Sequence, residues 1–376
     1  MVKETEKKLI CLLSRINLNE NEKKEISHLL EQKISWTYIF DVTLKNKCHL
    51  LVFENLKKFE IESDEYSKYS QIVRCMSFYN FYNLKSKYEE LNIFLEKLPK
   101  EIKVVPVKGA HLIKNMYKSF YIRATNDFDF LFKKEDLPTI KNILNNLGYY
   151  QGDYDSKTNT IIPFNAKKRI LYNTKMYNLL PYIKIVNNDA LKINLFDFSH
   201  SLDFDLKNNI VEEMIDVAYF DNGVWKLKPA HFFIHMCCHH YREGSHASWI
   251  LIGKDLNIIK FCDVREYVVN CMKHDDILEA IDFAKKHNLQ KAVYFTIYFV
   301  KEIYNTGFED EILNSLDISD ESFLYEYGEN EYDEVKTRKK DFWTSLFDRN
   351  NKDEIQEEFF HKLKENVFNE IIAESN

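Results

Sequence analysis

The sequence predicts an α+β protein in which a small mixed sheet lies between N-terminal and C-terminal helical regions. Long segments at both ends place apolar residues at helical spacing, and the 376 residues include only 8 Gly and 6 Pro. Around residues 127–132, aromatic side chains alternate with carboxylates, which is typical of a strand with one buried face. We therefore expect helical region 1–98, sheet region 99–215 and helical domain 216–376.

The N-terminal region predicts a series of amphipathic helices. Asn19 or Asn21 is placed to cap the second of them. Further helices are expected to begin near Trp36 and His49, and a long helix over Tyr79–Leu98 leads into the sheet region. We identify no catalytic motif in this part of the chain.

The segment after it predicts a strand, a glycine turn and a helix. Val104–Val107 is an apolar run, and the residues from Ala110 to Phe120 have helical spacing. Because glycine is scarce in this chain, Gly109 indicates a backbone constraint or a close approach, and amides at a helix start can contact phosphate. Lys108 and Arg123 could complement phosphate charge, although each also fits a solvated surface cation.

An Asp-x-Asp pattern follows on the next predicted strand. Asp127 and Asp129 would share one side, about 6.5–7 Å apart along the backbone, while Phe128 and Phe130 enter the core. At about 6 Å and an effective dielectric near 20, two such charges repel by roughly 3 kcal/mol. The pair therefore indicates either cations between the carboxylates or an exposed strand edge with both groups in water.

The rest of the sheet region predicts a helix and several strands. The helix ends at Leu147 with Gly148 as its stop, and residues 149–162 suit a hairpin. Two strands are expected over 176–186 and 190–198, joined by a turn at Asn187–Asp189.

The central motif resembles a known family. Lys108-Gly109, Leu112, Tyr117, Arg123 and the run Asn126–Leu131 are similar to the nucleotidyltransferase superfamily of the polymerase-β type. More narrowly they resemble its bacterial "uncharacterised nucleotidyltransferase" branch, whose pattern is Lys-Gly, Leu, Tyr, Arg and Asp-x-Asp. Segments 34–51 and 227–240 are similar to the helical parts of that branch. The Gly-Ser turn of the wider superfamily is Lys-Gly here, as in the branch.

This resemblance implies a nucleotidyltransferase palm and a reaction. Two Mg²⁺ (or Mn²⁺) ions would be held by Asp127 and Asp129, and an NTP would bind at Lys108, Gly109 and Arg123. An NMP, with AMP as the leading candidate, would pass to an acceptor hydroxyl with release of pyrophosphate. The acceptor is left open among a small molecule, a sugar, a peptide, a protein side chain and an RNA end.

The superfamily also implies a third carboxylate on a neighbouring strand, as general base and metal ligand. Asp197 is our candidate, and Asn194 is the alternative that could bind a metal but not accept a proton. A regular strand would bury the face that carries Asp197. We therefore expect a bulge or a strand end near Phe196, which would expose the carboxylate. That expectation rests on three apolar residues of the same parity: Leu191, Ile193 and Leu195. A structural role for Asp197 is the competing interpretation.

Asp203 and Asp205 repeat the Asp-x-Asp spacing, but no glycine turn precedes them, and we assign them no catalytic role.

In the C-terminal region Pro229 suits a first helical turn. A row of histidines at four-residue spacing follows it, on a face where we identify no carboxylate: His231, His235 and His239. Packing, metal binding and phosphate contact all remain open for this row.

Other carboxylates of this region are assigned simpler roles. Asp255 and Asp263 are possible partners for cations, and residues 317–334 are an acidic, solvated stretch. An amphipathic helix over Phe342–Ile372 is expected to close the chain.

Composition narrows the partners and the location. A net charge of −7 disfavours a long nucleic acid, and no apolar run suits a signal peptide or a membrane span. The seven cysteines match no zinc spacing and indicate reduced, mostly buried thiols in the cytoplasm. Two alternatives to an enzyme remain: an inactive palm kept as a nucleotide-binding or interaction module, and a helical partner-binding protein.

Overall fold

The computed structural model describes residues 3–202, 209–328 and 335–347, and it confirms the predicted α+β class. The chain forms two compact units, each built from several segments, and we describe each by itself. Of the described residues, 3–78, 116–124, 236–328 and 335–347 belong to unit 1, and 79–115, 125–202 and 209–235 belong to unit 2. The domain boundaries expected from the sequence stay a prediction.

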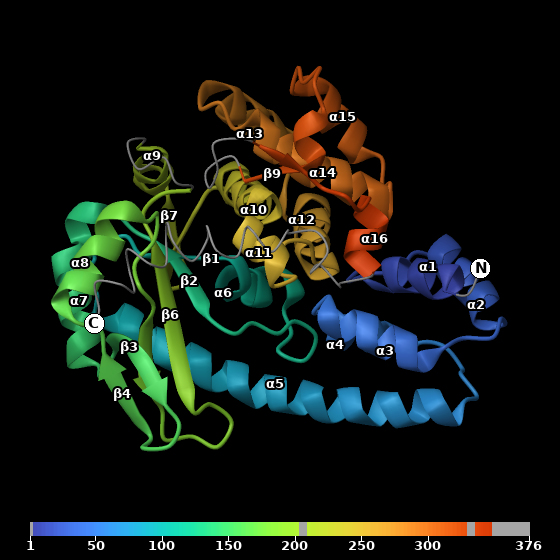
Figure 1. The fold of residues 1–376 in the computed structure, drawn as a ribbon, viewed down its shortest axis with the longest axis horizontal. Coiled ribbons are helices and arrows are strands. Elements are labelled where there is room, and N and C mark those ends of the chain that lie inside the picture. The colour runs from blue at the N-terminus through green and yellow to red at the C-terminus, as the bar shows by residue number, and fades with distance from the viewer. Residues whose placement is uncertain (1–2, 203–208, 329–334, 348–376) are drawn as a thin grey trace. The chain divides into compact units, whose positions relative to one another are not determined.

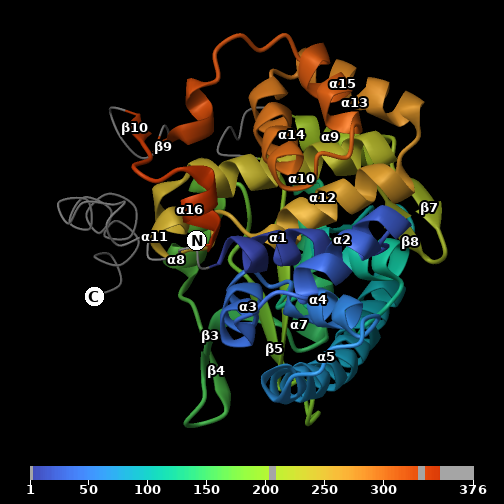
Figure 2. The same ribbon diagram turned by 90° about the vertical axis from the view of Figure 1, so that its right-hand side faces the viewer.

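Unit 1 is almost entirely helical. Asn19, one of the two predicted caps, caps α2 in a reciprocal pair with Glu22. Figure 2 shows α13, α14 and α15 side by side, and α12 also contacts α14. Its helices and short strands are α1 (Glu4–Leu13), α2 (Glu20–Leu30), α3 (Trp36–Lys45), α4 (His49–Leu56), α11 (Ala247–Leu251), α12 (Ile258–Cys271), α13 (His274–Lys286), α14 (Gln290–Tyr304), α15 (Phe308–Ser315), η3 (Ser322–Tyr325), β9 (Glu326–Tyr327), β10 (Lys336–Thr337) and α16 (Phe342–Phe347).

Unit 2 contains a six-stranded mixed sheet in the order β1-β2-β6-β5-β3-β4 (Figure 1). Only the β2–β6 pair is parallel in this sheet, and its other pairs are antiparallel. Its strands are β1 (Val105–Val107), β2 (Phe128–Leu131), β3 (Tyr150–Asp155), β4 (Thr160–Pro163), β5 (Tyr182–Ile185) and β6 (Ile193–Ser199), and a separate hairpin is formed by β7 (Tyr219–Asp221) and β8 (Val224–Lys226).

Two helices of unit 2 follow predicted signals, whereas the helices over Ala166–Lys175 and Ile210–Asp216 were not predicted. The helical signal after Gly109 gives a short α-helix, which continues as a π-helix from Ile113. Gly148 ends α7 with a positive φ of 84°. The helices are α6 (Lys108–Leu112), η2 (Lys134–Asp136), α7 (Leu137–Asn146), α8 (Ala166–Lys175) and α9 (Ile210–Asp216); α5 (Asp64–Lys97), η1 (Ile113–Tyr117) and α10 (Pro229–Ser245) have residues in both units.

The second half of α5 covers the apolar face of the sheet. The Tyr88 ring lies 4.8 Å from that of Phe128, and the Phe94 ring lies 5.9 Å from that of Phe130. Phe94 also contacts Phe196 on β6, at 5.6 Å between ring centroids. All four phenylalanines are fully buried, so this face forms the core and the opposite face of β2 and β6 presents polar groups.

Parts of three predictions lie outside the described residues, one of them being residues 329–334 of the expected acidic stretch. Asp203 and Asp205 fall there, and so does the expected C-terminal helix after Phe347.

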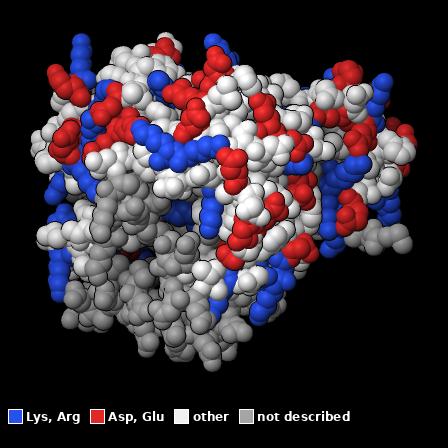
Figure 3. Space-filling model, turned by 90° about the horizontal axis from the view of Figure 1, so that it is seen from above, with Lys and Arg blue, Asp and Glu red and all other residues white. Residues whose placement is uncertain are grey.

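Among the residues that the structure describes, none belongs to a helix long and apolar enough to cross a membrane. On the face drawn in Figure 3, acidic and basic side chains are intermingled.

Candidate active site

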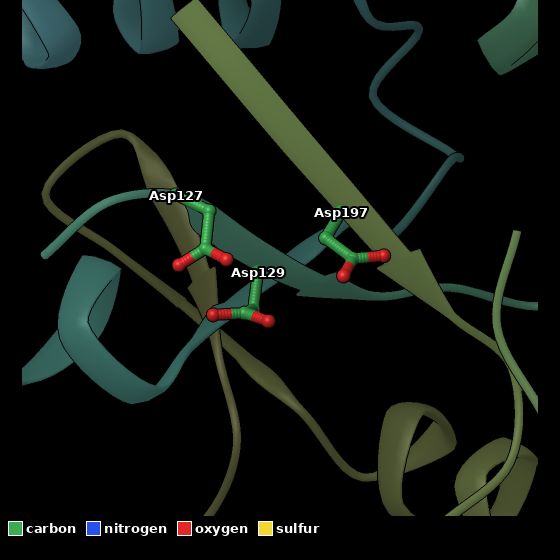
Figure 4. A group of neighbouring side chains, drawn as sticks. All are labelled: Asp127, Asp129 and Asp197. Carbon is green, nitrogen blue, oxygen red and sulfur yellow. The ribbon is translucent and has the colours of Figure 1, made fainter. Parts of the chain in front are cut away.

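Two neighbouring strands bring the three predicted carboxylates together. Strands β2 and β6 pair in parallel, and Asp129 is the direct register partner of Asp197. Asp127 lies one residue before β2 begins. One oxygen from each of the three lies within 4.8 Å of the others, and Figure 4 shows the carboxylates turned toward one another. No other group of three or more His, Cys, Asp or Glu residues in the described parts of the chain is placed to hold a metal.

The alternation of aromatic and acidic residues explains this placement. Phe130 stacks on Phe198 of β6 with ring centroids 4.9 Å apart, on the buried face of the sheet. Because successive residues of a strand point to opposite faces, burying these rings turns Asp129 and Asp197 to the other face. The apolar contact therefore fixes the register that places the two carboxylates side by side.

The strand of Asp197 differs from our expectation in one respect. Strand β6 continues past Phe196 in unbroken register with β2, so the strand itself neither ends nor bulges there, but its pairing with β5 ends at Phe196 as expected. The fully buried face of β6 is the opposite one, with Asn194 and the two phenylalanines, while the residues that share the parity of Asp197 are half-buried. Packing of large rings against α5 outweighs the smaller aliphatic side chains and sets which face is inside.

Asn194, the alternative third ligand, therefore points away from Asp129. Its side chain is fully buried, and its Nδ2 donates to the Tyr149 hydroxyl at 2.6 Å. Asn178 lies nearer the cluster, and its Nδ2 donates to Asp197 Oδ1 at 3.4 Å. The geometry thus favours Asp197 over Asn194.

Lys108 reaches the most buried carboxylate of the cluster. Its Nζ lies 2.6 Å from Asp129 Oδ1 in an ion pair, and Asp129 is 6% exposed. Burial raises the pKa of Asp129 to about 7, with Asp127 and Asp197 adding to the increase and Lys108 opposing it. A carboxylate held among like charges with one ammonium is suited to bind a further cation.

Gly109 packs against the segment that precedes the carboxylates. A Cβ atom at Gly109 would lie 2.7 Å from Thr125 Oγ1 and 2.9 Å from Thr125 Cβ, so a larger residue would require Thr125 to shift. Thr125 Oγ1 in turn donates to the carbonyl of Asp127 at 3.0 Å. The close approach expected at this scarce glycine is therefore to Thr125, and the left-handed residue of the turn is Lys108, with φ 48°.

Lys87 is a site neighbour that our sequence analysis missed. It lies on α5, is 3% exposed, and its Nζ donates to the carbonyls of Thr125 at 2.8 Å and Asn126 at 2.6 Å. Burial lowers the pKa of Lys87 to about 8, against the opposing effect of the Asp127 carboxylate. A lysine that bonds main-chain carbonyls leaves no pattern of residue types, because every residue carries a carbonyl.

Arg123 belongs to a buried network in unit 1. Its Nε and Nη2 donate to Asp263 at 3.1 and 2.6 Å, and the Tyr117 hydroxyl donates to the same carboxylate at 2.7 Å. The prediction that Asp263 and Asp255 pair with cations is confirmed, since Asp255 binds Arg338 at 2.8 Å. The expected contact of Arg123 with phosphate stays a prediction.

The histidine row lies on α10, and its three members are mostly buried. His239 contacts Arg242 through Nδ1 at 3.0 Å and Glu243 through Nε2 at 3.3 Å. Our statement that no carboxylate shares this face was wrong, because Glu243 is four residues after His239 and one helical turn brings them together. The row is not part of the carboxylate cluster.

The residues of the cluster fit a divalent metal of the Mg²⁺ or Mn²⁺ kind. Carboxylate oxygens are the ligands that these hard cations prefer. Asp127, Asp129 and Asp197 offer such oxygens within 4.8 Å of one another, from two paired strands and the residue before one of them. The ion pair with Lys108 offsets part of the negative charge of the three carboxylates, and a divalent cation would offset more of it.

Comparison with known proteins identifies the family. No curated protein and no solved structure matches the chain. The family described as "Uncharacterised nucleotidyltransferase" matches residues 32–305, which include the whole carboxylate cluster and most of the chain. The chain therefore belongs to this uncharacterised nucleotidyltransferase family.

Proposed function

We propose that the protein is a metal-dependent nucleotidyltransferase with a palm of the polymerase-β type. It would transfer an NMP, with AMP as the leading candidate, from an NTP to an acceptor hydroxyl and release pyrophosphate. The observation that carries this proposal is the cluster of Asp127, Asp129 and Asp197 on adjacent parallel strands, in a chain of a nucleotidyltransferase family. The proximity of Asp197 to the other two supports an active palm over an inactive one.

The three carboxylates would hold two divalent ions. Bound Mg²⁺ or Mn²⁺ would supply charge stabilisation at the attacking and leaving oxygens and at the triphosphate. Asp127 and Asp129 would provide ligands from one strand and its approach, and Asp197 would provide one from the neighbouring strand. Buried phenylalanines behind the strands keep these groups from moving apart, which suits catalysis by positioning.

Lys108 would serve the nucleotide as well as the cluster. Its ammonium pairs with Asp129 at 2.6 Å, and arriving metal ions would take over that carboxylate. The same ammonium could then pair with a β- or γ-phosphate oxygen beside the Gly109 turn. Arg123 would need to leave Asp263 to make such a contact, so we assign the main phosphate charge to Lys108.

Asp197 would accept the proton of the acceptor hydroxyl. The hydroxyl oxygen forms a bond to the α-phosphorus, the bond from that phosphorus to the bridging oxygen breaks, and pyrophosphate leaves. Acceptor selection by the C-terminal helical residues and a cytoplasmic location remain parts of this proposal. The location is supported by the cysteines, five of the seven being buried thiols.

The test is incubation with each α-labelled NTP and Mg²⁺ or Mn²⁺, with detection of pyrophosphate and of label on co-purified molecules. We expect Asp127→Asn and Asp129→Asn to lose about a thousandfold in rate, because metal charge stabilisation supplies about 4 kcal/mol or more. Asp153→Asn, at an exposed position on β3, is the control. Near-normal transfer by either site variant would refute the metal assignment, and nucleotide binding without pyrophosphate release would favour an inactive module.

A further inference from the structure

A buried lysine holds the main chain that leads into the carboxylate cluster. Lys87 on α5 directs its ammonium at two consecutive carbonyls, those of Thr125 and Asn126, at 2.8 and 2.6 Å. Burying an ammonium group costs free energy unless the group is hydrogen-bonded. The two carbonyls therefore account for the burial of the Lys87 ammonium. Two of the three N–H donors of the ammonium bind main-chain carbonyls, so these hydrogen bonds restrain the path of the backbone.

The position of Asp127 explains why such a hold is needed. Asp129 and Asp197 are register partners within the β2–β6 ladder, whose first pair is Phe128 with Phe196. Asp127 precedes that ladder, so strand pairing does not set its direction. Its carboxylate nevertheless lies within 4.8 Å of the other two. The segment before it therefore contributes to its orientation.

That segment is held from two further directions. Gly109 packs so closely on Thr125 that a Cβ atom would overlap its side chain. Thr125 Oγ1 donates to the carbonyl of Asp127, which ties the two ends of the turn together at 3.0 Å. Lys87 restrains the same segment from α5 through its hydrogen bonds to the two carbonyls. Of the three interactions described here, only that of Lys87 involves a charged group.

We propose that Lys87 is a positioning residue that fixes the Thr125–Asn126 main chain and so directs Asp127 toward Asp129 and Asp197. This role rests on the proposed function, because the direction of Asp127 matters when the three carboxylates bind a cation together. Lys87 acts through the backbone and makes no contact with the reacting groups in this proposal. It deepens the assignment of the site without changing the reaction.

The experiment measures Mn²⁺ binding to the nucleotide-free, full-length protein by electron paramagnetic resonance, for wild type and Lys87→Met. Loss of a nearby positive charge would by itself tighten binding of a cation. Loss of the hold on Asp127 would weaken it, because residues that orient metal ligands are worth about 10- to 100-fold in affinity. We expect Lys87→Met to bind Mn²⁺ at least about tenfold more weakly.

Lys103→Met is the matched control. Lys103 also donates to two main-chain carbonyls in unit 2, those of Ile215 and Asp216, at 3.2 and 2.8 Å. Neither residue is part of the cluster. We expect this variant to lower the melting temperature while its Mn²⁺ affinity stays within about twofold of wild type, since distant sites act independently.

Mn²⁺ binding by Lys87→Met that equals or exceeds that of wild type would overturn the role of Lys87 and leave the proposed function intact. Wild-type protein that binds no Mn²⁺ would overturn the proposed function and this role with it. Should Lys87→Met fail to fold, Lys87→Gln replaces it, because the amide keeps two donors on a side chain one bond shorter. A smaller weakening is expected of that variant, because a side chain one bond shorter cannot reach both carbonyls, and unchanged affinity would again refute the role.

Discussion

Lys108→Met tests whether the cluster binds cations, because it is expected to strengthen metal binding rather than weaken it. In the structure the Lys108 ammonium pairs with Asp129 at 2.6 Å, so a metal ion must compete with it for that carboxylate. Methionine has a similar length and no charge. The substitution therefore releases one carboxylate oxygen from its ion pair and removes a positive charge from the cluster.

The size of the effect follows from the contact that is lost. A hydrogen bond to a charged group contributes about 1.5–3 kcal/mol, which corresponds to about 10- to 150-fold in affinity. Most of that should appear as tighter Mn²⁺ binding to nucleotide-free protein, because Asp129 is buried and gains little from water. With Mn²⁺ saturating, NTP affinity should fall about tenfold, since one charge-assisted phosphate contact disappears.

The assay is Mn²⁺ titration by calorimetry, first without nucleotide and then with a non-hydrolysable NTP. Lys226→Met is the control, because Lys226 pairs with Asp221 at 2.7 Å in the same unit and neither residue belongs to the cluster. Its Mn²⁺ affinity should match that of wild type. Weaker or unchanged Mn²⁺ binding by Lys108→Met would show that this ammonium does not compete with a metal, and the reasoning would fail.

Two further predictions concern stability. Asp263→Asn should lower the free energy of unfolding by about 3–5 kcal/mol in urea denaturation, because it leaves the buried Arg123 charge uncompensated; a loss below about 1 kcal/mol would contradict this. Burial, with a smaller effect of Lys226, lowers the pKa of His111 from 6.5 to about 3. Between these two pH values the unfolded chain binds a proton at His111 that the folded chain does not bind. The free energy of unfolding therefore falls as the pH drops from 6.5 toward 3. His111→Phe should reduce that slope by about 1.4 kcal/mol per pH unit in the same assay, and an unchanged slope would refute it.

The sheet and its carboxylates could be predicted because their signal is local. Alternation of Phe128 and Phe130 with Asp127 and Asp129 sets which face of a strand is buried, whatever the neighbouring strand is. The position of Asp197 on a neighbouring strand came from the family resemblance. Only the structure shows the direct register of Asp197 with Asp129, which follows from packing the aromatic residues of both strands on one face.

The contacts around the cluster could not be predicted, because they join distant segments. Arg123 and Asp263 are 140 positions apart, and sequence spacing says nothing of which carboxylate a buried arginine will meet. Lys87 is harder still, because its partners are carbonyls that every residue possesses. Long helices such as α5 carry many lysines, and local patterning assigns all of them to solvent.

Two lysines of unit 2 act on the carboxylates in different ways, one directly and one through the backbone. Comparing their substitutions distinguishes a metal site from a surface that is only acidic. Lys108 binds a carboxylate directly, so its loss should favour a competing cation. Lys87 binds the backbone beside Asp127, so its loss should disfavour that cation although it too removes a positive charge. A general electrostatic effect would move both affinities in the same direction. Opposite shifts in Mn²⁺ affinity therefore require carboxylates whose geometry, and not only whose charge, binds the ion.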